Sequence, residues 1–342
     1  MAKLRYSAEE ILADHSFARP HVEAGYRLHG GFDANDHYIS PRTLNRWPAI
    51  RAWTDALRAQ GHDLVDPSHA LLGYDCYPNE AQQKFLLSLG LGQTLWNALT
   101  ITGVIEARGK RLAEATAPDF QEIIVEDISD MATGHLSRGL LRAHGLDEGG
   151  DDARGEGGHD AMWFAVRDML FGKDAWPPAD IPESLSRPEL GRLMPQIPKE
   201  YEDWILLLMN VLMIEVRAEK FFGFCTDVMR DPDNFTGRRE AALHAADLVD
   251  RIRQDEASHV GYLTAIVSEL RSVHIRTIDG ATISGKMMID PVWRGMVHWH
   301  AVINREHDRE STREAVFRRL SELKNGTMLT RRFDEFEGRK AA

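Results

Sequence analysis

Apolar residues recur along much of the chain at the three- and four-residue spacing of an α-helix. A small β-hairpin is expected around Asp279-Gly280, where residues alternate on either side of a turn pair. Elsewhere the helical pattern dominates, and it predicts an all-α protein. The four longest helices are expected over residues 81–112, 118–144, 199–229 and 237–273. The first two are separated by a short break, so they should form an antiparallel hairpin.

The remaining chain is expected to surround these four helices. Residues 1–80 should form an N-terminal helical extension, and residues 274–342 a C-terminal extension with the hairpin and further helices. Residues 81–273 form the core, interrupted by a crossover at 145–198. The crossover begins with a Gly-rich acidic stretch at 145–159, which is expected to be a surface linker, and continues with a proline-rich segment that cannot be a long helix.

Composition and charge argue against several classes of function and location. The 342 residues include 41 Lys and Arg against 53 Asp and Glu, a net charge of −12, which argues against a nucleic-acid partner. The most apolar run, 205–214, is about half the length that a bilayer requires, so no membrane span is expected. Cys76 and Cys225 provide no disulfide framework, and a cytoplasmic location is expected.

Charged residues occupy positions where the helical pattern calls for aliphatic ones. Glu106 lies on the apolar face of the first long helix, and Glu215 on that of the third. In the fourth helix, one face carries Ile252, Glu256, His259, Leu263, Ile266 and Leu270. In the second helix the pattern is less regular.

On that second helix, Asp127 and Asp130 share a face with Phe120. We take these two aspartates as its inward-facing carboxylates. Glu126 and His135, on neighbouring faces, are the alternatives.

Several buried carboxylates that lie close together must be neutralised by a cation, because burying even one unpaired carboxylate costs several kcal/mol. Glu106 and Asp127 lie about nine and twelve residues from the turn that joins their helices. Glu215 and Glu256 lie about 17 and 18 residues from theirs. Each pair can therefore meet across its hairpin, either around arginines or around metal ions.

The spacing of Glu256 and His259 favours metal. At positions i and i+3 a carboxylate and an imidazole project side by side, so the carboxylate can bridge two ions while the imidazole binds one. Oxygen-rich sites with one or two imidazoles suit iron or manganese, and iron is the first choice. Tyr262, one turn beyond His259, is expected to be a core tyrosine, with a hydrogen-bonding role near the metals as the alternative.

This arrangement resembles the ferritin-like carboxylate-bridged di-iron superfamily, in which two helices supply one Glu each and two others supply a Glu-x-x-His pair each. Glu106 and Glu215 match the single carboxylates, and Glu256 with His259 matches one pair. Asp127-Ile-Ser-Asp130 stands at the second pair, with Asp in both places. The resemblance implies a ferritin-like four-helix bundle that binds two Fe ions, with Mn or a mixed Fe/Mn pair as alternatives.

The same resemblance implies an oxygenase or oxidase that uses O₂ to hydroxylate, desaturate or N-oxygenate a small organic substrate. Reducing equivalents would come from an external electron donor, and a homodimer is one possible assembly. The long extensions outside the core favour an enzyme over an iron store. Two alternatives remain open: a metal-free all-α binding or scaffold protein with salt-bridged glutamates, and a haem-oxygenase-like di-metal bundle in which Asp255 replaces Glu256 beside His259.

Overall fold

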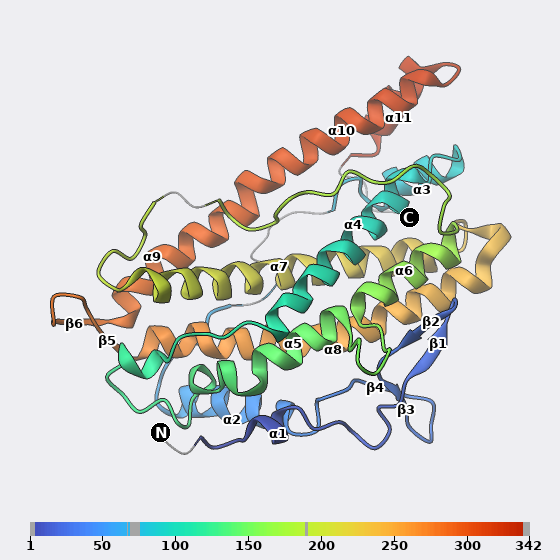
Figure 1. Cartoon of the computed structure of the whole chain (residues 1–342). Coiled ribbons are helices and arrows are strands. Elements are labelled where there is room, and N and C mark those ends of the chain that lie inside the picture. Colours follow the sequence, from blue (N-terminus) through green and yellow to red (C-terminus); the bar gives the residue numbers. More distant parts are fainter. Residues whose placement is uncertain (1–3, 67, 69–75, 189–190, 338–342) are drawn as a thin grey trace.

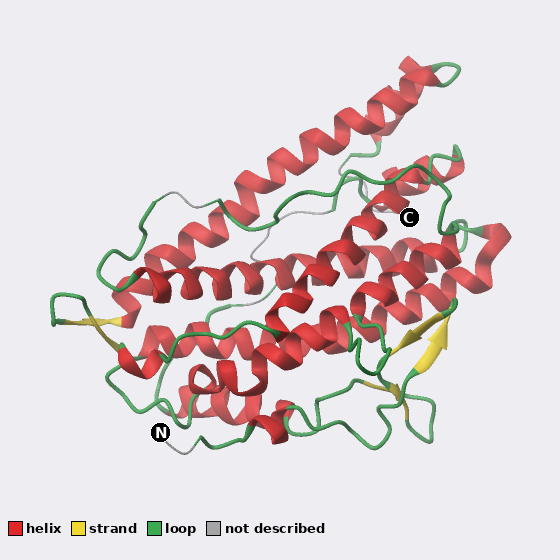
Figure 2. Cartoon of the chain, in the orientation of Figure 1, coloured by secondary structure: helices red, strands yellow, loops and turns green. Residues whose placement is uncertain are grey.

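The computed structural model describes residues 4–66, 68, 76–188 and 191–337. The described residues are 61% helix and 6% strand, so the predicted all-α class is confirmed. Figure 2 shows helices throughout the body of the molecule and only short strands at its margins. Within the described ranges, none of the helices combines the length and the apolar character needed to cross a bilayer.

Two long helices form the centre of the fold (Figure 1). Helix α7 spans Lys199–Arg230 and α8 spans Arg239–Ser272, within two residues of the predicted bounds, and the two pack against each other. Helices α2 (Arg46–Ala59), α6 (His159–Leu170) and α9 (Gly285–His298) also pack against α8. Because α8 is covered on several sides, almost all of its residues from 255 to 270 are buried.

The first predicted helix is divided in two. Helix α3 spans Glu80–Ser88 and α4 spans Gln93–Gly109, and Gly90 between them has a φ of 74°, which ends α3. Helix α4 packs against α6 and against α5, a short helix over Leu141–Gly149.

The prediction of a second long helix over residues 118–144 is wrong. Its place is taken by irregular backbone and short helical turns, and α5 begins only at Leu141. The side chain of Gln121 accepts from the Ile128 N–H and donates to the carbonyls of Ile124 and Glu126, so backbone groups that a helix would pair internally are satisfied otherwise. Gly139, at a φ of 117°, interrupts the helical geometry again before α5.

The N-terminal extension contains strands as well as the expected helices. Helix α1 (Ala8–Ile11) is followed by the pairs β1 (His21–Glu23) with β2 (Tyr26–Leu28) and β3 (Gly31–Phe32) with β4 (Tyr38–Ile39). Leu28 at the end of β2 forms a bridge with Gly157, which joins this extension to the crossover before α6.

The C-terminal extension begins with the predicted hairpin. Strands β5 (His274–Arg276) and β6 (Thr282–Ser284) are antiparallel, with Ile275 opposite Ile283. After α9 and a π-helical turn, α10 (Asn304–Glu322) runs outward along the side of the bundle, and α11 (Gly326–Glu335) packs back on it (Figure 1).

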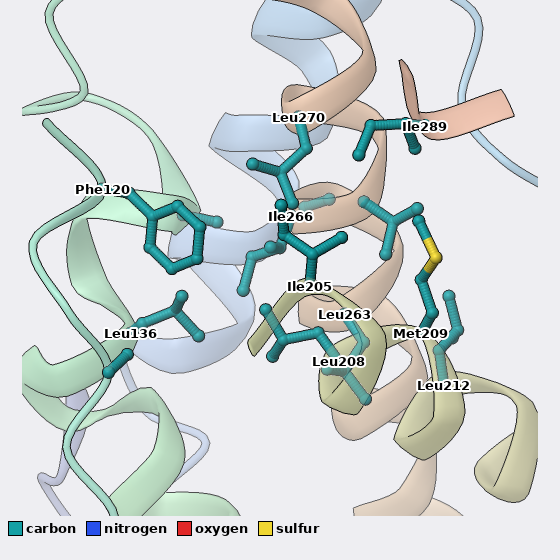
Figure 3. Close-up of a cluster of buried hydrophobic side chains, with 14 of the residues drawn as sticks. Phe120, Leu136, Ile205, Leu208, Met209, Leu212, Leu263, Ile266, Leu270 and Ile289 are labelled. Atoms are coloured by element: carbon teal, nitrogen blue, oxygen red, sulfur yellow. The ribbon is translucent and has the colours of Figure 1, made fainter. Parts of the chain in front are cut away.

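The apolar core consists of two main clusters arranged along α7 and α8. In the first, Ile205 and Leu208 of α7 pack with Leu263 and Ile266 of α8 (Figure 3). The second cluster is built around Trp163, Phe222 and Val249, among other side chains. On α8, residues 255–259 lie between the segments that contribute to these clusters, so the polar residues of that stretch are held between two apolar regions.

Candidate metal centre

Seven buried side chains from five helices meet between α4, α5, α6, α7 and α8. They form two groups of four, and within each group one ligand atom per residue lies within 4.8 Å of the others. The first group is His144, Glu148, Glu215 and His259, and the second is Glu106, Glu148, His159 and Glu256. Glu148 belongs to both groups. The buried groups of the described chain could therefore hold metal ions at two adjacent positions.

Two carboxylates lie between the histidines. Glu256 Oε1 is 3.0 Å from His159 Nδ1, and Glu256 Oε2 is 2.8 Å from His259 Nδ1. Glu148 Oε1 is 3.2 Å from His259 Nδ1 and 3.4 Å from His159 Nδ1. It is also 3.5 Å from His144 Nε2. Both carboxylates thus face ligands of the two groups at once, which is the geometry that a bridging carboxylate requires.

Each histidine has a hydrogen-bond partner on the side that faces away from the glutamates. His259 Nε2 lies 3.1 Å from Asp147 Oδ2, and His159 Nε2 lies 3.1 Å from Asp255 Oδ2. His144 Nδ1 lies 2.7 Å from the hydroxyl of Tyr262. Such partners fix the orientation of an imidazole and leave its other nitrogen directed at the centre.

The two outer aspartates are themselves held by buried cationic or donor groups. Asp147 pairs with Arg42 at 2.5 Å and with Arg46 at 2.7 Å. Burial alone would raise the pKa of Asp147, but the two guanidinium groups outweigh it and hold that pKa well below its usual range. Asp255 contacts His29 at 3.1 Å in addition to His159.

The four glutamates of the two groups do not share the arginine partners of Asp147. Within the described residues, every ion pair made by Glu148, Glu215 and Glu256 is to a histidine, and Glu106 makes none. No arginine or lysine therefore neutralises this cluster from within the described chain, since Arg42 and Arg46 reach Asp147 instead.

The pKa values reflect this crowding. Burial, together with the charge of Glu256, raises the pKa of Glu215 to about 8. Burial and the neighbouring Glu148 raise the pKa of Glu106 well above its usual range. Burial lowers the pKa of His144, but its contacts with Tyr262, Glu148 and Glu215 raise it to about 10 overall. Without metal, protons on these groups offset the carboxylate charges, and a metal ion would have to displace them.

The Gly-rich stretch 145–159 was predicted to be a surface linker, which holds only for residues 152–155, an exposed turn; its two ends are buried and build part of the centre. A Cβ on Gly145 would lie 2.3 Å from the backbone nitrogen of Ala113, so glycine lets α5 closely approach the 3₁₀ turn Lys110–Ala113 that follows α4. Gly150 has a φ of 70° and lets the chain turn back toward α6. These two features place Glu148, near the end of α5, beside His159, at the start of α6.

The structure brings four of the six predicted ligands together: Glu106, Glu215, Glu256 and His259. Asp127 and Asp130 are exposed, and Asp127 accepts hydrogen bonds from Ser129, so the prediction that these two aspartates face the centre is wrong. They lie on the segment that is not helical, and Glu148 supplies the carboxylate expected from them.

The alternatives considered for that position also lie elsewhere. Glu126 pairs with His274 in an exposed contact. His135 is buried but accepts from the Tyr6 N–H and contacts the Met131 carbonyl. Sequence reasoning missed His144, Glu148 and His159. A signal was present, because Leu141, His144 and Glu148 advance by three and four residues and so share one helix face.

A cavity of about 870 Å³ reaches this cluster, and its lining includes Glu106, His144, Glu148 and Glu215. A small molecule in this cavity would therefore lie beside Glu106, Glu148, Glu215 and His144. Comparison with known proteins gives no significant match, whether to a family model, a curated protein or a solved structure.

Proposed function

We propose that this chain is a ferritin-like, carboxylate-bridged di-iron oxidoreductase that uses O₂ to oxidise a small organic substrate. The observation that carries the proposal is the convergence of buried glutamates and histidines at one centre, with no arginine or lysine paired to these glutamates in the described chain. His159 Nδ1 lies 3.0 Å from Glu256 Oε1 and 3.4 Å from Glu148 Oε1, and all three side chains are buried. Burying several carboxylates side by side is unfavourable, and metal coordination would offset that cost.

Charge and ligand sharing support two ions. Four glutamates carry up to four negative charges, which two divalent cations would balance. Glu148 is common to both four-residue groups, and Glu256 faces histidines of both. The four carboxylates and three imidazoles form an oxygen-rich set that suits iron, with manganese or a mixed pair as the alternatives.

The proposed bundle departs from the usual ferritin-like ligand pattern in one half. Glu256 with His259 on α8 is a standard Glu-x-x-His pair, and Glu106 and Glu215 are the single carboxylates. In place of the second pair, α5 supplies His144 and Glu148 in reverse order. Helix α6 adds a third imidazole, His159.

The bound ions would supply the O₂-dependent redox chemistry, and the chain would supply geometry and a shielded pocket. Glu148 and Glu256, which face the histidines, would hold the ions together with Glu106 and Glu215, and Glu106, Glu148 and Glu215 also line the cavity. Tyr262 keeps the outer nitrogen of His144 engaged. In a hydroxylation, one oxygen atom would enter the substrate and the other would leave as water, with a pair of electrons and two protons from an external donor.

The two competing interpretations are less consistent with the contacts. A metal-free scaffold with salt-bridged glutamates predicts arginine or lysine among them, whereas in the described chain Arg42 and Arg46 pair with Asp147 instead. A haem-oxygenase-like ligand set would use Asp255 in place of Glu256. Asp255 instead lies on the outer side of His159, next to His29.

Metal analysis tests the assignment. We expect the purified protein to bind about two Fe per chain and the Glu215→Ala/Glu256→Ala variant to lose them. The Asp127→Asn/Asp130→Asn variant is the matched control, since it also removes two carboxylate charges but from the surface, and it should retain the iron. Equal iron content in all three proteins would refute the assignment.

The reaction class has its own test. Protein loaded with Fe(II) without oxygen should show a new optical absorption when it is exposed to O₂, and the control variant should behave in the same way. If the wild type binds iron but its absorption does not change with O₂, the chain has a metal site but is not an O₂-dependent oxidoreductase.

A further inference from the structure

The cavity that reaches the glutamates has the size of a ligand site. Its volume of about 870 Å³ lies within the range of roughly 300–1,000 Å³ that is typical of small-molecule pockets. Helices α4 and α7 form two of its walls, and residues 183–186 of the crossover and part of α10 also line it.

The walls nearest the glutamates are apolar. On α7, Val211, Ile214 and Phe221 line the cavity, and their spacing places them along one face of the helix. On α4, Ile101 and Ile105 do the same. None of these five side chains is fully buried, because the helix faces that carry them border the cavity. An apolar ligand body would cover them.

Cationic side chains line another part of the cavity, near the end of α4. The Arg108 guanidinium donates through Nη1 to the backbone carbonyls of Pro182 and Glu183, at 2.6 and 3.1 Å. Arg111 is exposed. In the described chain neither arginine pairs with a carboxylate. By contrast, Arg217 and Arg309, which also line the cavity, pair with Asp308 and Glu337.

This distribution is unusual for an acidic protein. The chain carries a net charge of −12, yet two arginines that have no acidic partner among the described residues line a cavity whose lining also includes Glu106, Glu148 and Glu215. A guanidinium binds a carboxylate in a charge-assisted and often bidentate geometry, which fixes the orientation of the ligand. The apolar side chains Ile105 and Ile214, next to Glu106 and Glu215 in the sequence, would then cover the apolar part of the ligand while the arginines bind its carboxylate.

We propose that the substrate is an organic carboxylate with an apolar body, bound by Arg108 and Arg111 and oriented with its apolar part toward the metal centre. This inference rests on the proposed function, because the bound carboxylate is a substrate only if the centre is catalytic. The binding of such an anion can be measured separately from turnover.

The test compares carboxylates with their neutral amides. Octanoate, decanoate and 4-phenylbutyrate, and the amide of each, are titrated into the full-length metal-loaded protein by calorimetry. At least one carboxylate should bind about tenfold more tightly than its amide, as a charge-assisted contact requires. In Arg108→Gln/Arg111→Gln this preference should fall about tenfold while amide binding stays unchanged.

The matched control is Arg51→Gln/Arg58→Gln, which removes two exposed arginines from α2, outside the cavity lining, and should leave the preference intact. If no carboxylate binds the wild type more tightly than its amide, the inference is overturned, and this comparison does not depend on any variant. Iron content is measured on the same samples. If the protein prefers carboxylates but binds no iron, the anion site stands and the proposed oxidoreductase function is wrong. Failure of the anion site can therefore be told apart from failure of the proposed function.

Discussion

The Nε2 atom of His259 lies 3.1 Å from Oδ2 of Asp147, and both side chains are completely buried. This contact joins the centre of α8 to α5 and leaves Nδ1 of His259 directed at Glu256 and Glu148. Because Asp147 also pairs with Arg42 and Arg46, one carboxylate both orients a proposed metal ligand and compensates two buried positive charges.

Replacing Asp147 should therefore affect stability and metal binding together. In Asp147→Asn the two arginines lose their charged partner, and we expect the free energy of unfolding to fall by about 3 kcal/mol. His259 loses the group that orients it, so metal affinity should fall by about ten- to a hundredfold. Urea unfolding and metal titration measure the two effects.

The control for this variant is Asp203→Asn on α7. Asp203 pairs with Lys199 one turn away, in an exposed contact whose loss should cost less than about 0.5 kcal/mol. If the two variants are equally stable, the buried network does not have the role we assign to it.

Replacing Tyr262 tests whether the orientation of His144 matters for metal binding, and it should perturb the fold less than replacing Asp147. Its hydroxyl is 2.7 Å from His144 Nδ1, so Tyr262→Phe should reduce metal affinity about tenfold and lower stability by only about 1 kcal/mol. Tyr201→Phe is the matched control, because it removes a buried tyrosine hydroxyl that donates to Glu122 instead. Similar metal affinity in the two variants would contradict a role for Tyr262 at the centre.

The metal-free protein should lose stability as the pH rises. His144 has a pKa of about 10 in the folded chain against 6.5 as its ordinary value, so its stabilising contribution is complete below pH 6.5 and is lost as the pH rises through 10. Glu215, with its pKa raised to about 8, acts in the same direction, because ionising it becomes unfavourable in the folded state above its ordinary pKa of 4.5.

Urea unfolding at pH 6.5, 8 and 9.5 measures this dependence. The metal-loaded protein should show a much smaller decline, since coordination has already displaced the protons concerned. Equal declines with and without metal would show that these groups do not share a site with the ions.

The parts of the fold that the sequence predicted best are those with a long uninterrupted period. Helices α7 and α8 each exceed 30 residues, so their apolar faces repeat many times and a single charged residue on such a face is conspicuous. Glu215, Glu256 and His259 were visible for this reason. Glu106 was visible on α4 by the same argument.

Short elements could not be predicted in this way. Helix α5 has only nine residues and contains glycines, so the pattern that carries His144 and Glu148 is brief and resembles a linker. The wrong prediction for Asp127 and Asp130 has a different cause, because here a helical pattern is present but no helix forms. Their segment has helical periodicity, but the Gln121 hydrogen bonds and the bridge between Ile124 and Ile275 hold it in another conformation. These are tertiary contacts that no local pattern reveals.

The central claim is that two metal ions lie between the glutamates and histidines of α4 to α8. Anomalous X-ray diffraction at the iron edge, on crystals of the iron-loaded protein, tests it most directly. The account predicts two anomalous peaks about 3.5–4 Å apart, both within coordinating distance of Glu148 and flanked by His144, His159 and His259. A map with no peak among these side chains, or with iron bound only elsewhere on the protein, would contradict it.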